Sequence, residues 1–202
     1  MHRDGTGEAK RLPDSATQRY PMSYTPDGRH LAYVEPRPDT RGDIWILSRD
    51  GEAFPLMNTS FNETYPQFSP DGAWLVYTSD ETGQDEIFVQ PYPGPGPKRR
   101  VSIDGGMMPL WSRDGKELFY RGKASVMAVS VSLSPTFESG RPNALFEDRY
   151  FIGFPAFPGF TYDVAPDGRF LMIEPDAPAE PERIHVVVNW FEELQELVPT
   201  NN

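Results

Sequence analysis

The amino-acid sequence predicts an all-β protein: a β-propeller of four-stranded antiparallel blades, about four of them in this chain. One pattern occurs four times, each copy is centred on a tight-turn motif, and further short apolar segments follow each copy. The copies occupy residues 23–33, 67–77, 110–120 and 163–173. A repeat of about 40 to 50 residues is typical of propellers, because one unit is too small to bury its own faces.

Each copy contains a predicted turn that joins two antiparallel strands. The pattern is an aromatic or apolar residue, then Ser or Thr, then Pro-Asp-Gly; Arg113 replaces the proline in the third copy, and the fourth copy is degraded. Proline presets φ, Asp bonds back to the backbone, and Gly accepts the left-handed conformation. We therefore assign a structural role to the turn residues Asp27, Gly28, Asp71, Gly72, Asp114, Gly115, Asp167 and Gly168.

The segments that follow each turn supply the rest of a blade. The strand after the turn, for example residues 74–77, is apolar without alternation, as expected of a strand buried on both faces. A third strand and a short fourth strand follow, and four strands make one propeller blade. We expect one propeller domain over residues 1–202, with blades at about 20–58, 64–104, 108–147 and 160–190.

The two ends of the chain are expected to complete the last blade. Residues 1–13 resemble the turn and fourth strand at residues 49–56, so we expect them to supply a closing strand, residues 8–12, that pairs with residues 184–188. Within one chain this pairing closes a four-bladed ring; between two chains it closes an eight-bladed homodimer by strand exchange. A short C-terminal helical turn is expected within residues 190–198, where apolar residues recur at helical spacing.

Composition restricts the classes of function. The chain of 202 residues has a net charge of −11, which disfavours nucleic acid as a partner because phosphates require a basic surface. No stretch approaches the roughly 18 apolar residues of a membrane-spanning helix, so no membrane insertion is expected. The N-terminus lacks the apolar segment of a signal peptide, and the chain contains no cysteine. These features leave the cellular compartment open.

Catalytic motifs are absent from the sequence. Only His2, His30 and His185 could serve as a general base, and none lies in a recognisable arrangement with a nucleophile. No kinase signature occurs. The sequence therefore predicts no catalytic residue and no cofactor, and a protein that is not an enzyme.

A metal site is also not expected. Residues 80–86 gather four carboxylates in one loop, but the spacing of an EF-hand is missing, which favours a solvated hairpin. A metal-dependent propeller hydrolase of the lactonase type needs polar ligands that converge from the innermost strands. Those strands, around Tyr24, Phe68, Trp111 and Val164, are apolar. The hydrolase remains an alternative that this composition weighs against.

The most unusual segment is rich in aromatic residues and broken by proline and glycine. Its candidate partner-binding residues are Tyr150, Phe151, Phe154, Phe157, Phe160 and Tyr162. One interpretation is a loop that binds a partner, since aromatic anchors dominate interface hot spots. The other is an ordinary crossover whose rings pack between the third and fourth blades, since large aromatic residues are usually buried.

The repeated pattern resembles the TolB-type β-propeller repeat. Residues 61–64, 91–96 and 188–194 further resemble propellers at the C-termini of bacterial serine/threonine kinases. The resemblance implies a propeller in the periplasm or the cytoplasm, although intact members usually have six or more blades. Such repeats serve as protein-docking domains, kinase sensor domains and gating propellers beside peptidase domains. We therefore expect a non-catalytic propeller that binds a protein or peptide, with a propeller hydrolase or a gating propeller of a peptidase as the alternative.

Overall fold

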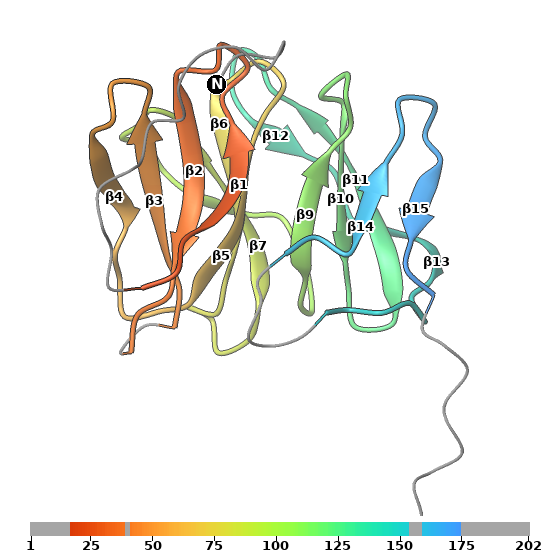
Figure 1. Cartoon of the computed structure of the whole chain (residues 1–202). Helices are drawn as coiled ribbons and strands as arrows, with labels where there is room; N and C mark the ends of the chain where they lie inside the picture. The colour runs from red at the N-terminus through yellow and green to blue at the C-terminus, as the bar shows by residue number, and fades with distance from the viewer. Residues whose placement is uncertain (1–16, 39–40, 154–158, 175–202) are drawn as a thin grey trace, which may run out of the picture.

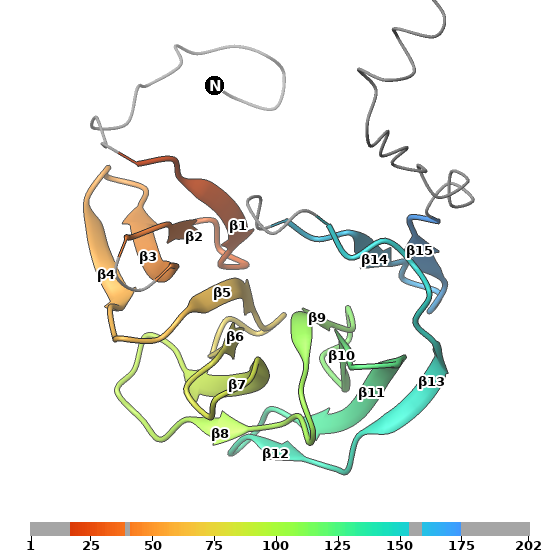
Figure 2. The ribbon, with the colours of Figure 1, turned by 90° about the horizontal axis from the view of Figure 1, so that it is seen from below.

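The computed structural model describes residues 17–38, 41–153 and 159–174. In this part of the chain four antiparallel sheets stand around a common axis like blades, with strands β1, β5, β9 and β14 nearest the centre (Figure 2). The predicted fold class, an all-β propeller of about four blades, is confirmed. The expected closing strand (residues 8–12), third strand of the last blade (184–188) and helical turn (190–198) lie outside the described residues.

The first two blades each contain four strands in sequential order. Blade 1 consists of β1 (Tyr20–Tyr24), β2 (His30–Glu35), β3 (Asp43–Ser48) and β4 (Ala53–Met57). Blade 2 consists of β5 (Glu63–Phe68), β6 (Trp74–Ser79), β7 (Glu86–Pro91) and β8 (Arg99–Arg100).

Blade 3 has an additional short strand, and two strands of blade 4 are described. Blade 3 consists of β9 (Met107–Trp111), β10 (Glu117–Arg121), β11 (Ser125–Ser132), β12 (Glu138–Ser139) and β13 (Asn143–Glu147). Both β12 and β13 pair with β11. Blade 4 is the hairpin of β14 (Tyr162–Val164) and β15 (Phe170–Met172).

The four Asp-Gly turns lie together at one end of the blades, which we call the turn end (Figure 1). The chain passes from blade to blade at the opposite end, which we call the crossover end. The turn glycines Gly28, Gly72, Gly115 and Gly168 have φ between 68° and 83°. Only glycine adopts this left-handed conformation at little cost.

A hydroxyl group fixes the length of the first three turns. The side chains of Thr25, Ser69 and Ser112 each donate a hydrogen bond of 2.6–2.8 Å to the Asp two residues later. Each also accepts the backbone N–H five residues later, at 2.9–3.1 Å. In the same turns, the backbone N–H of the Ser or Thr donates to the backbone carbonyl of the residue five positions later, for example from Ser69 to Trp74 at 2.9 Å. This bonding holds the two inner strands of each of these three blades in one register.

The fourth turn lacks this hydroxyl and is one residue shorter. Ala165 occupies the Ser or Thr position, and its N–H donates to the carbonyl of Arg169, four residues later, at 2.8 Å. Val164 therefore lies opposite Phe170, whereas the equivalent Phe68 in blade 2 lies opposite Leu75. A shift of one residue turns every side chain of a strand to the other face of the sheet.

The shift changes which residues of β15 face blade 3. The ring of Phe170 packs edge-on against Phe119 and Phe146, with centroids 5.1 and 5.2 Å apart. Leu171 is 72% exposed, although the equivalent Leu75 is fully buried. The lost hydroxyl thus places an aromatic residue between blades 3 and 4 and leaves an apolar residue on the far face.

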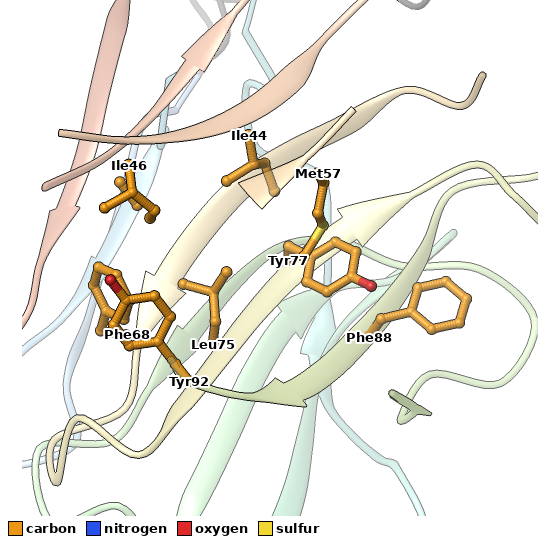
Figure 3. Close-up of a cluster of buried hydrophobic side chains, with 9 residues drawn as sticks. Ile44, Ile46, Met57, Phe68, Leu75, Tyr77, Phe88 and Tyr92 are labelled. Atoms are coloured by element: carbon orange, nitrogen blue, oxygen red, sulfur yellow. The ribbon is translucent and has the colours of Figure 1, made fainter. Parts of the chain in front are cut away.

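Two apolar clusters join the first three blades. Between blades 1 and 2, Ile44 and Ile46 face Leu75, Tyr77 and other residues of blade 2 (Figure 3). Between blades 2 and 3, the opposite face of blade 2 packs against blade 3, with Val76, Ile87 and Val89 opposite Leu118, Tyr120 and Val129. Each central blade is buried on both faces, which explains the apolar strands without alternation.

The register of β15 can be tested by thiol accessibility, because the chain has no cysteine of its own. We expect Leu171→Cys to react with a soluble thiol reagent as fast as Leu145→Cys, which lies at an exposed position of β13. Leu75→Cys, at the same repeat position as Leu171, should react at least about a hundredfold more slowly, because it needs local unfolding to be reached. Equal, slow reaction of Leu171→Cys and Leu75→Cys would show that blade 4 keeps the register of the other blades.

Candidate functional site

The aromatic segment at the crossover end is organised by one buried arginine. Arg121 is the last residue of β10 and is 1% exposed. The equivalent positions in β2 and β6 hold Val34 and Thr78, which are also buried. Arg121 therefore carries a charge at a position that other blades fill with a small side chain, and burial of a charge is costly unless it is fully paired.

All five N–H donors of the guanidinium group have partners. Nε and Nη2 bind the two carboxylate oxygens of Asp148, at 2.7 and 2.5 Å. Nη2 also donates to the carbonyl of Tyr150 at 2.8 Å, and Nη1 donates to the carbonyl of Phe151 at 2.6 Å and to Thr161 Oγ1 at 2.8 Å. An arginine offers five donors in a fixed plane, so this set satisfies it completely.

These bonds hold the two ends of the aromatic segment together. Thr161 Oγ1 lies 3.5 Å from the carbonyl of Ile152, and the hydroxyl of Tyr162 donates to the carbonyl of Met108 at 2.7 Å. The N–H of Phe151 donates to the carbonyl of Ile173, beyond β15, at 2.9 Å. The segment therefore leaves and re-enters the blades at one fixed point.

The structure places four of the six predicted aromatic residues. Tyr162 is buried and stacks on Phe170, and Tyr150 packs edge-on against Phe146 at 6.3 Å. Phe151 and Phe160 are half-buried. Phe154 and Phe157 lie outside the described residues. The described rings thus include both packed residues and residues that keep an accessible face.

Phe160 meets an aromatic residue of another blade. Its ring lies edge-on to Tyr65 of β5, with centroids 5.5 Å apart. Tyr65 is half-buried and has a left-handed backbone, φ 54°, at an irregularity in the pairing of β5 with β6. A left-handed non-glycine residue costs energy and is held by its surroundings. The pair Tyr65–Phe160 therefore brings blade 2 and the entry to blade 4 into contact at the crossover end.

Charge and exposed apolar surface accompany this pair. Burial raises the pKa of the Tyr65 hydroxyl, and the negative charge of Asp85 raises it further, whereas the positive charge of Arg121 lowers it. Burial and the charge of Asp80 likewise raise the pKa of Asp85. Ile152, at the base of the aromatic segment, is 51% exposed. The arrangement offers aromatic and aliphatic contacts beside a carboxyl group.

Sequence reasoning found the aromatic segment but missed Arg121 and Tyr65. A comparison of repeat positions could have indicated Arg121, because it replaces Val34 and Thr78 in aligned strands. Its partner Asp148 is 27 residues away, so no local pattern joins the two. Tyr65 carries no sequence signal beyond the proline that follows it.

The acidic loop at residues 80–86 is used for structural contacts. Asp80 forms an ion pair with Arg41 and accepts the N–H of Asn62 at 2.9 Å. Glu81 is paired with Lys98, and the buried Glu86 accepts the hydroxyl of Ser102. Among the described residues, no three His, Cys, Asp or Glu side chains gather in a way that could hold a metal ion.

A buried carboxyl group outside the acidic loop, that of Glu63, lies between blades 1 and 2. Glu63, the first residue of β5, is 2% exposed, and its Oε1 accepts the hydroxyl of Thr59 at 2.5 Å. Its Oε2 has no hydrogen-bond partner in the described part of the chain. Burial raises the pKa of Glu63 to about 7, and the charges of Asp43 and Asp80 add to it while the Thr59 bond and Lys98 lower it.

His30 lies at the opposite end of the molecule from the aromatic segment. Its ring packs edge-on against Tyr92 at 5.8 Å, where the equivalent Trp74 packs against Phe137 at 5.5 Å. An open pocket of about 320 Å³ lies between the turns of blades 1 and 2, and its lining includes His30, Asp27 and other turn residues. His2 and His185 lie outside the described residues.

Comparisons with known proteins support the fold. No protein-family model matches the chain. A TolB-type protein from Agrobacterium tumefaciens superimposes with a TM-score of 0.53 and 22% identity, over 69% of this chain and 51% of the other. TolB from Acinetobacter baumannii gives a TM-score of 0.50 and 19% identity, over 65% and 34% of the two chains. The described residues include no helix able to cross a membrane. The chain has the fold of TolB-like β-propellers.

The sequence comparison corrects one expectation. The chain is 31% identical over 103 residues to the uncharacterized peptidase YuxL of Bacillus subtilis, which covers 47% of this chain and 16% of the relative. The expectation that the protein is not an enzyme is contradicted, because a relative that matches part of this chain is named as a peptidase. That expectation was based on the absence of known catalytic motifs from the sequence. Function depends on the residues of individual sites, which neither a missing motif nor a shared fold reveals.

We expect Arg121→Met to destabilise the protein by about 3–5 kcal/mol, because it leaves the carboxylate of Asp148 buried without its partner. Urea unfolding would measure this loss. The double variant Arg121→Met/Asp148→Leu should lose less stability than the sum of the losses of the two single variants, since no unpaired charge remains. Lys116→Met removes an exposed ion pair with Asp114 and should cost less than about 1 kcal/mol. A similar small effect for Arg121→Met would contradict the role assigned to the buried pair.

We expect Glu63 to make stability fall as the pH rises. The usual pKa of 4.5 rises to about 7 in the folded protein, so the native state binds the proton more tightly between these values. The wild type should lose stability across this range, and Glu63→Gln should remove the loss and be more stable by about 2 kcal/mol at pH 8. Unfolding at pH 4.5 and 8 would show it, with the exposed Glu138→Gln as control. An equal pH dependence of Glu63→Gln and wild type would disprove this account.

Proposed function

We propose that this propeller binds a polypeptide segment at its crossover end, on the surface formed by Tyr65, Asp85, Ile152 and Phe160. The observation that carries the proposal is the contact between Phe160 and Tyr65, which unites two blades in one half-exposed aromatic surface. Aromatic side chains with an accessible face are the commonest anchors of protein interfaces.

The fixed base of the aromatic segment supports binding energetically. Arg121 holds residues 148, 150, 151 and 161 in place through bonds within the chain. A surface that is already ordered loses little conformational entropy when it binds, so more of the contact energy appears as affinity. The exposed Ile152 and the carboxyl group of Asp85 add an apolar contact and an acceptor for the backbone or a basic side chain of a peptide.

A second candidate function is favoured by the match to a relative named as a peptidase. In that case the propeller presents or gates a polypeptide substrate for hydrolysis, the alternative that the sequence raised. The chain spans 16% of that relative's length, so the activity of the whole relative comes to this chain only as a proposal. The resemblance to kinase-linked propellers supports the same binding step in a sensor domain.

Binding can be tested with a library of displayed random peptides selected against the purified protein. We expect a peptide to be enriched, and its affinity, measured by fluorescence anisotropy, to fall at least about tenfold in Phe160→Ala and in Ile152→Asp. Leu145→Asp, at an exposed position of the outer strand β13, is the matched control and should bind as the wild type does.

A fluorogenic version of the selected peptide separates binding from hydrolysis. Cleavage by the wild type would support the peptidase candidate, and binding without cleavage would support recognition alone. Failure to enrich any peptide, or equal affinity of the two site variants and the control, would overturn the proposed function.

A further inference from the structure

Basic side chains lie over aromatic rings at several places in this protein. Three aromatic rings of the described residues each have a basic group 5.4–5.6 Å from the ring centre. These pairs are Arg19–Tyr33, Arg37–Trp45 and Lys98–Phe88. A cation at this distance is attracted by the negative face of the ring, and the attraction grows when water is partly excluded.

Each of these basic side chains is also paired with a carboxylate. Arg19 and Arg37 each bind Glu35, at 3.1 Å, and Lys98 is paired with Glu81. The carboxylate balances the charge while the ring contacts the same basic group, so two favourable interactions act on one cation. The protein thus repeatedly combines an aromatic ring, a carboxylate and a basic side chain.

The surface proposed to bind a polypeptide has the first two of these components. The planes of the Tyr65 and Phe160 rings lie at 70° to each other, so the pair presents aromatic faces in two directions. The carboxylate is that of Asp85, whose negative charge acts on the Tyr65 hydroxyl. The carbonyl of Asp85 accepts the N–H of Gly106 at 2.8 Å, which places Asp85 beside the start of β9, the neighbour of β5 near the centre (Figure 2).

No basic side chain of the described residues supplies the third component. None lies over the rings of Tyr65 and Phe160, and none forms an ion pair with Asp85. Two guanidinium groups influence this surface electrostatically, but each is engaged by a different carboxylate. These engaged pairs are Arg41–Asp80 and Arg121–Asp148.

A partly buried carboxylate gains from a cation beside it. Asp85 is half-buried, and burial raises its pKa, as does the charge of Asp80 to a lesser degree, because both disfavour the ionised form. A basic group that binds here offsets this cost, and partial burial makes its attraction to the carboxylate and the rings stronger than in water. The exposed Ile152 provides an apolar contact for the aliphatic stem of a long basic side chain.

We propose that the polypeptide bound at the crossover end places a lysine or arginine side chain against the rings of Tyr65 and Phe160 and the carboxylate of Asp85. This inference rests on the proposed function and adds the chemical class of the residue that is recognised. The net charge of −11 also favours the approach of basic segments.

Peptides selected from the random library test the recognised side chain. We expect the enriched peptides to share a lysine or an arginine. Norleucine in its place keeps an aliphatic stem and removes the charge. This exchange should lower the affinity at least about tenfold, because the contacts of the cation with the carboxylate and with the rings are both lost.

Variants of the protein test the carboxylate and the rings. Asp85→Asn should bind the basic peptide at least about tenfold more weakly and the norleucine peptide as the wild type does. Phe160→Leu keeps an apolar side chain and should weaken the basic peptide more than the norleucine peptide. Glu138→Gln, which removes an exposed carboxylate of β12, is the matched control and should bind both peptides as the wild type does.

Reversal of the charges distinguishes direct contact from a structural role of Asp85. Asp85→Lys should bind a peptide with glutamate at the basic position more tightly than the wild type binds it. A carboxylate that only supports the fold would not produce this exchange of preference. Circular dichroism identifies any variant that fails to fold.

The outcomes separate this inference from the proposed function. A selected peptide that depends on Phe160 and Ile152 but binds equally well with norleucine, or contains no basic residue, overturns this inference and leaves the proposed function intact. Equal binding of the basic peptide by Asp85→Asn and the wild type also overturns the inference alone. Failure to enrich any peptide overturns both.

Discussion

The constraint on which this structure depends is that each blade is apolar on both faces and must be covered on both. Blade 2 satisfies it completely, with Leu75 and Tyr77 against blade 1 and Val76 and Ile87 against blade 3. Because a four-stranded sheet cannot bury its own faces, no blade is a stable unit by itself. The short turns and crossovers follow from this constraint, since they keep successive sheets face to face around one axis.

The junction of blades 3 and 4 meets the same constraint with different chemistry. Phe170 supplies an aromatic contact to blade 3, and Arg121 supplies a polar one, with all five donors engaged by the segment that leads into blade 4. A buried ion pair of this kind gives little net stability but requires one arrangement of the chain around it. It holds the two described ends of this crossover, at Tyr150–Phe151 and Thr161, at one point of the blades.

The surface on which the proposed polypeptide recognition depends combines residues of two blades. The half-exposed rings of Tyr65 and Phe160 come from different blades, so the surface exists only in the assembled propeller. Sites of this kind are built on loops that a rigid scaffold positions.

The sequence alone determined the fold class, because the Asp-Gly turns and the doubly buried strands are local patterns that repeat. It also identified the aromatic segment by composition. It could not determine that Arg121 is buried, because the partner Asp148 and the carbonyls of Tyr150 and Phe151 come from a different part of the chain. Nor could it determine the register of β15, although Ala165 is visible as a missing hydroxyl. Only the tertiary structure decides whether a strand then shifts, since the packing of Phe170 against blade 3 must favour the new register over the old one.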